Sequence, residues 1–240
     1  FCVIYTTLTV KEYPPQLYNE YHQITPDTAT NASNQTESKQ KAESSNLFAL
    51  LVKAPSTFWT VGLVQFFCWA AFMYMWVYAN GTIADTCWGV DMQDAHASTS
   101  KAYQEAGNWV GMLYAVQAVG SVIWAMVLPQ FKNRKLGYIV SLVLGAVGFS
   151  LVPFIHHPYV QFVSFLLIGC AWAAMLAMPF TFVTNALQGY GHMGAYLGLF
   201  NGTICVPQII ASLCGGGLLL LVGSNQTNMM FVAAVCLVLG

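Results

Sequence analysis

Five long apolar segments are the feature of this chain that most constrains its fold. They lie near residues 57–80, 107–129, 136–155, 159–184 and 195–222, and none has a Lys, Arg, Asp or Glu in its middle. The hydrocarbon core of a bilayer is about 30 Å thick, and a helix needs about 20 apolar residues to cross it. The segments therefore predict an all-α, polytopic membrane protein.

The composition excludes other classes of protein. Charged residues make up 7% of the 240-residue chain and hydrophobic residues 57%, whereas an ordinary soluble domain has about 25% charged residues. With so few charges, a soluble protein would lack the groups to cover its surface. The formal net charge is −1. A nucleic-acid partner needs a basic patch, so we expect none.

The polar stretches divide the chain into three regions. Residues 1–10 are apolar but too short to cross a bilayer, so we interpret them as the end of a preceding transmembrane helix. Residues 11–55 include the polar run 26–46, which cannot bury enough apolar surface to order itself, and they predict a largely disordered central loop. Residues 56–240 predict a transmembrane bundle that is truncated in its last helix, because the final apolar run has no polar exit.

The distribution of positive charge predicts the orientation of the chain. The loop 130–135 carries Lys132, Arg134 and Lys135, and the loop 11–55 carries four further lysines, whereas 81–106 has one Lys among several acids. Cytoplasmic loops of membrane proteins carry the excess of Lys and Arg. We therefore expect the 11–55 and 130–135 loops to be cytoplasmic, in a multi-pass protein of the plasma (inner) membrane.

Uncharged polar and aromatic side chains lie near the middle of four of the five segments. Amides can pair with hydroxyl groups, and aromatic rings can stack on the apolar face of a sugar, whereas neither suits a bare ion. Polar residues at membrane depth are the functional candidates in a chain with so few charges. The pattern predicts a substrate site for a neutral, polyhydroxylated ligand, made by Gln65, Trp69, Gln117, Trp172, Asn201 and Gln208.

Structural roles are an open alternative for several of these residues. A Gln or Asn inside a span often bonds a neighbouring helix. Trp76 and Trp88 lie near the outer interface, where tryptophans anchor helices in the headgroup region. The row Gly194, Gly198 and Gly202 allows close approach of two backbones, so it predicts a tight helix pair.

The segments lack the groups that an enzyme would need. Acid–base and nucleophilic catalysis usually rest on paired Asp, His, Ser or Cys residues, and no Asp, Glu or His lies in the middle of a segment. The seven cysteines show neither a CxxC motif nor the spacing of metal ligands. We therefore predict a protein that is not an enzyme and has no metal or cofactor.

The order of the regions resembles the second half of a major facilitator superfamily transporter, in which a central cytoplasmic loop precedes a six-helix bundle. The turn PQFKNRK (129–135) resembles the basic cytoplasmic motif of that superfamily, although the usual glycine and acidic residue are missing. This departure puts a gating salt bridge at the turn in doubt. The resemblance implies a missing N-terminal bundle as the partner of this one.

Two segments are similar to helices of one group in that superfamily, the sucrose:proton symporters and their maltose-type bacterial relatives. GCAWAAMLAMPF (169–180) resembles the tenth helix of the group, and GAYLGLFNGTICVPQII (194–210) resembles the eleventh. Trp172, Pro179, Asn201 and Gln208 match the motifs. The resemblance implies uptake of a sugar such as sucrose or maltose with a proton or other cation, by alternating access. Another small neutral solute, or a receptor function, remains an alternative.

Overall fold

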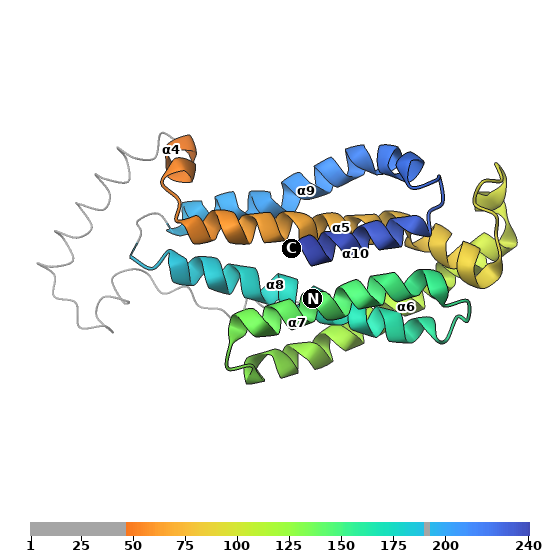
Figure 1. The fold of residues 1–240 in the computed structure, drawn as a ribbon, viewed down its shortest axis with the longest axis horizontal. Coiled ribbons are helices and arrows are strands. Elements are labelled where there is room, and N and C mark those ends of the chain that lie inside the picture. The colour runs from red at the N-terminus through yellow and green to blue at the C-terminus, as the bar shows by residue number, and fades with distance from the viewer. Residues whose placement is uncertain (1–46, 190–192) are drawn as a thin grey trace, which may run out of the picture. The chain divides into compact units, whose positions relative to one another are not determined.

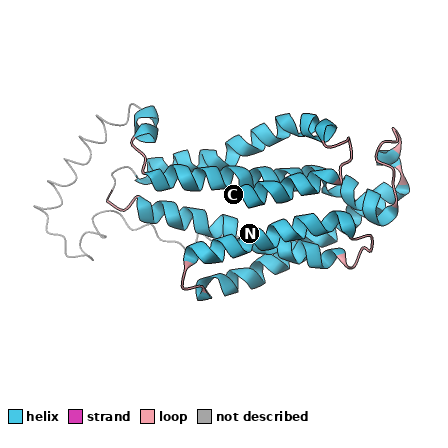
Figure 2. Ribbon diagram, viewed as in Figure 1, coloured by secondary structure: helices cyan, strands magenta, loops and turns pink. Residues whose placement is uncertain are grey.

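The computed structural model describes residues 47–189 and 193–240, and all the regular secondary structure in these ranges is helical (Figures 1 and 2). The predicted helix end at 1–10 and most of the predicted loop 11–55 lie outside the described residues. The chain divides into two compact units. The first contains the short helix α4 (Leu47–Val52), and the second, residues 53–240, contains all the other helices.

Six α-helices are described in the second unit. They are α5 (Ser56–Trp88), α6 (Lys101–Val127), α7 (Arg134–Leu151), α8 (Gln161–Ala186), α9 (Met193–Leu221) and α10 (Asn228–Leu239). The first five are long and apolar enough to cross a membrane, which confirms the five predicted spans and supports a multi-pass membrane protein. At 12 residues, α10 is shorter.

Two of the helices extend beyond the predicted spans by more than one turn. The apolar segment near 57–80 belongs to a helix that continues to Trp88, and the next helix begins at Lys101 rather than near 107. Hydropathy marks only the part of a helix that suits a bilayer, whereas helix ends depend on local stop and start signals. Gly89, with a φ of 64°, ends α5, and the Ser100 hydroxyl accepts the Tyr103 N–H at 3.1 Å to cap α6.

Helix α5 is the centre of this bundle. It packs against α6, α8, α9 and α10 (Figure 1). Its buried face includes Cys68, Ala71, Phe72 and Met75, each completely buried. The small and flexible side chains on this face allow several neighbours to approach one helix.

The closest helix crossings occur at glycines of α6, α7 and α8. A Cβ atom at Gly169 would lie 2.5 Å from the carbonyl oxygen of Gln117, and one at Gly148 would lie 2.7 Å from that of Ser164. The predicted tight pair at Gly194, Gly198 and Gly202 is wrong within this bundle, because a Cβ there would meet no described atom within 4 Å. The sequence shows where a helix surface consists of small residues, but it does not show which of these surfaces packs against another helix.

The connections between helices gather at two ends of the bundle. Ser56 at the start of α5, Lys135 at the start of α7 and Asn185 at the end of α8 line one cavity. At the other end, the Thr227 hydroxyl donates to the Asp85 carboxylate at 2.7 Å. The predicted sidedness, with the Lys135 end in the cytoplasm, stays a prediction.

Gly169→Ala should destabilise the bundle, because its new methyl group meets the α6 backbone rather than a side chain that can move. We expect a loss of about 1–3 kcal/mol in the free energy of unfolding, measured by thermal unfolding of the purified chain in detergent. The control is Gly216→Ala, where the methyl group meets no described atom within 4 Å and should be neutral or stabilising. Equal effects of both substitutions would contradict the close crossing.

Candidate functional site

Three tryptophans from α5 and α8 form a compact cluster. The ring centroid of Trp172 lies 5.7 Å from that of Trp69 and 5.7 Å from that of Trp76, and Trp69 and Trp76 are 6.4 Å apart. Both contacts of Trp172 are edge-to-face, with interplanar angles of 77° and 76°. This arrangement is favourable for aromatic quadrupoles. We call these three residues the tryptophan cluster.

The direction of side chains along a helix explains how Trp76 reaches the other two. In an α-helix each side chain leans toward the helix N-terminus. The starts of α5 and α7 lie beside the end of α8, so α5 and α8 run in opposite directions. Trp76 therefore leans toward Trp69, whereas Trp172 leans the opposite way along the bundle, toward Trp76.

The cluster rests on buried phenylalanines and opens on one side. The ring of Phe72 lies 5.0 Å from Trp172 and 5.6 Å from Phe149 of α7, and both phenylalanines are completely buried. Trp69 is 7% exposed, whereas Trp76 is 40% exposed. The cluster thus has buried aromatic rings on one side and one solvent-accessible ring, Trp76, on the other.

Gln65 bonds α8 one turn before the internal proline of that helix. Proline has no N–H, so Pro179 removes the helical hydrogen bond that the carbonyl of Met175, four residues earlier, would accept. The Gln65 side-chain amide donates to that same carbonyl oxygen at 3.3 Å. Gln65 is completely buried, and its Oε1 atom has no hydrogen-bond partner among the described residues. Gln65 therefore makes the bond to a neighbouring helix that was the alternative interpretation of this residue.

Gln117 and Trp172 lie on facing helices. The carbonyl of Gln117 faces Gly169, which is one turn from Trp172 on α8. The Gln117 side chain is 6% exposed, and its Oε1 atom has no partner among the described residues. Buried polar atoms are nearly always paired, so this acceptor is available to a group outside the described chain.

Asn201 and Gln208 have no described hydrogen bond or ring contact with the tryptophan cluster. Both are on α9, which packs mainly on α5 through Tyr196 and Phe200. Asn201 is exposed and Gln208 is half-buried. The structure thus places Trp69 and Trp172 in contact, with Gln65 one turn away on α5 and the Gln117 backbone against α8, and joins neither Asn201 nor Gln208 to them by a described contact.

Two further residues share the site face of α5. Trp76 and Asn80 continue the spacing of Gln65 and Trp69 along the helix, and the Asn80 amide lies beside Gly107 of α6. The Asn80 Oδ1 atom is buried and lacks a described partner. The four- and three-residue spacing along α5 could have identified both residues from the sequence. The position of Trp76 near the outer membrane interface instead favoured an anchoring role.

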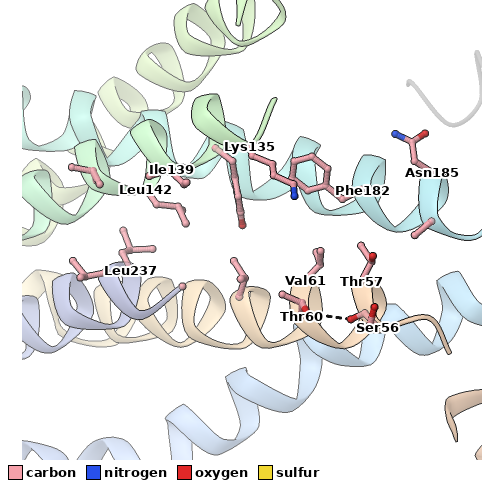
Figure 3. Close-up of a pocket in the computed structure, with 16 residues that line it drawn as sticks. Ser56, Thr57, Thr60, Val61, Lys135, Ile139, Leu142, Phe182, Asn185 and Leu237 are labelled. Carbon is pink, nitrogen blue, oxygen red and sulfur yellow. Dashed lines mark hydrogen bonds between the residues drawn. The ribbon is translucent and has the colours of Figure 1, made fainter. Parts of the chain in front are cut away.

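A further cavity lies elsewhere in the bundle. It measures about 850 Å³ and lies between α5, α7, α8 and the last residues of α10 (Figure 3). Ser56, Lys135 and Asn185 line it together with apolar residues such as Leu142 and Leu237. None of the predicted site residues lines this cavity, and it contains none of the unpaired buried polar atoms. The tryptophan cluster is therefore the better candidate site.

Comparison with protein-family models finds no match to this chain, and comparison with curated proteins finds none either.

The bond between Gln65 and Met175 can be tested by a double-mutant cycle. Gln65→Leu should lower the free energy of unfolding by about 1–3 kcal/mol, because it leaves a buried carbonyl unpaired. In a Pro179→Ala background the helix regains its own N–H donor, and Gln65→Leu should cost less. Unfolding of the four variants in detergent measures the difference. An equal cost in both backgrounds would contradict the pairing.

Proposed function

We propose that this chain is the second bundle of a secondary active transporter of the major facilitator type. Its substrate would be a small neutral solute, in the first place a sugar such as sucrose or maltose, taken up with a proton or another cation. The resemblance of 169–180 and 194–210 to sugar-symporter helices supports the substrate class. The structural support comes from the exposed faces of α6 and α9.

The observation that carries the proposal is the low burial of α6 and α9. In their most apolar stretches, 22% of the α6 residues and 17% of the α9 residues are buried, against 50–56% in the other three spans. A span on the outside of a bundle needs one buried face and one lipid face. These two helices each have a third face.

The third face of α9 carries polar and small residues. With about 100° per residue, the buried Tyr196, Phe200, Pro207 and Ala211 share one side of the helix, and the exposed Val206, Ile209, Ile210 and Leu213 share another. Between them, Asn201, Cys205, Gln208 and Ser212 form a polar stripe. Amides facing lipid lose their hydrogen bonds to water, so this stripe suits a water-filled path or a second bundle.

The third face of α6 carries mainly small residues. Met112, Val119, Ile123 and Met126 form its exposed bulky side. Gly111, Ala115, Ala118 and Ala125 form a neighbouring exposed stripe, which also contains Val122, 63% exposed. Small residues allow close approach of another helix. Two such faces on one bundle support a partner bundle that meets α6 and α9.

The internal prolines support alternating access as the mechanism. Pro179 lies inside α8 and Pro207 inside α9, where each removes one helical hydrogen bond. Apolar helices that contain Gly or Pro near a midplane site are a common feature of transporters that alternate between two states. The middle parts of the described spans contain no Asp, Glu or His. Coupling to a cation would therefore rest on groups of the partner bundle.

Uptake of radiolabelled sucrose and maltose by vesicles that carry the full-length protein tests this function. We expect accumulation that depends on an inward proton gradient. Asn201→Ala and Gln208→Ala should raise the KM about two- to ten-fold, the effect of losing one hydrogen bond to the substrate. The control is Ile209→Ala, next in sequence but on the lipid side. A parent that accumulates neither sugar would contradict the substrate class.

The proposed sidedness can be tested by labelling. In a background without other reactive cysteines, Gln130→Cys should react with a membrane-impermeant maleimide only in inside-out vesicles, because its loop is proposed to be cytoplasmic. Ala95→Cys, exposed in the loop between α5 and α6, is the matched probe and should react only in intact cells. The reverse pattern would invert the topology.

A further inference from the structure

The exposed member of the tryptophan cluster is unusual in its surroundings. Trp76 is 40% exposed, yet its ring contacts Trp69, Phe72 and Trp172. A tryptophan that only anchors a helix at the interface needs no such support. Buried rings on several sides fix the orientation of this one and leave part of it open to contact.

A hydrogen-bond donor beside this ring is unused. The Trp69 Nε1–H is buried and has no acceptor among the described residues. Leaving such a group unpaired is costly, and buried tryptophans normally find a partner for their N–H. A hydrogen-bond acceptor from outside the described chain would satisfy this N–H donor.

An unused acceptor lies one turn away on the same helix. Gln65 Oε1 is also buried without a described partner, and residues four apart share one face of a helix. A hydroxyl group both donates and accepts hydrogen bonds, so hydroxyls suit this donor and this acceptor together. No charged side chain contacts the cluster among the described interactions, which favours an uncharged ligand.

We propose that Trp76 is the stacking platform of the substrate site and that the Trp69 N–H donates to an oxygen of the same ligand. The inference rests on the proposed transport function. The ligand class is a ring-shaped polyol such as a pyranoside, whose C–H face lies on Trp76 and whose oxygen atoms meet Trp69. Trp172 is a positioning residue, since its edge-to-face contacts hold the other two rings.

The test is the kinetics of sucrose and maltose uptake by tryptophan variants of the full-length protein. Trp76→Leu, which removes the aromatic face, should raise the KM about ten-fold with a maximal rate within about two-fold of the parent. Trp76→Phe keeps a smaller ring and should have an intermediate KM. Trp69→Phe keeps a ring but loses the N–H, and should raise the KM about two- to ten-fold.

Trp59→Leu is the matched control, because Trp59 lies on the same helix, is 54% exposed and has Phe58 as its described ring contact. Its KM should equal that of the parent. If the parent transports a sugar and neither Trp76 variant changes the KM, the platform is rejected and the proposed function stands. If the parent transports neither sugar, the proposed function fails, and the platform fails with it.

Discussion

The architecture of this bundle depends on one constraint: in an apolar medium, backbone N–H and C=O groups must form hydrogen bonds within the protein. Only helices do so within a single segment, which is why five apolar runs predict five helices. The same need makes an internal proline expensive. At Pro179 a helical bond is missing, and the Gln65 amide, from another helix, donates to the carbonyl left free on Met175. A polar residue at membrane depth is thus part of the fold.

Close helix crossings then determine where the aromatic side chains meet. Gly169 allows α8 to approach the backbone of α6, and Trp172, one turn further on, contacts α5 at Trp69 and Trp76. Glycine at the crossing and tryptophan beside it complement each other. The first brings the α8 backbone against α6, and the second fills space between α8 and α5.

The sequence predicts the helices well and the site only in part. Apolar length is a property of one segment, so the spans could be found, although their ends could not because Gly89 and Ser100 act locally. The spacing along α5 placed Gln65 and Trp69 on one face. The contacts between helices cannot be predicted in this way. Nothing in the sequence links Gln65 to Met175 or assigns Trp76 to a cluster. Nor does it show that the glycine row of α9 meets no described helix.

The α8 carbonyl that Pro179 leaves free and the tryptophan cluster are adjacent on both helices. Gln65 and Trp69 are one turn apart on α5, and their contacts, Met175 and Trp172, are one turn apart on α8. Because a helix turn moves as a unit, bending α8 at Pro179 shifts the Met175 carbonyl and the Trp172 ring together relative to α5. In the proposed transporter, that shift would directly change the contacts of a ligand lying on Trp76. Gln65, which pairs the carbonyl that Pro179 leaves free, would therefore link a bending motion of α8 to the geometry of the proposed site.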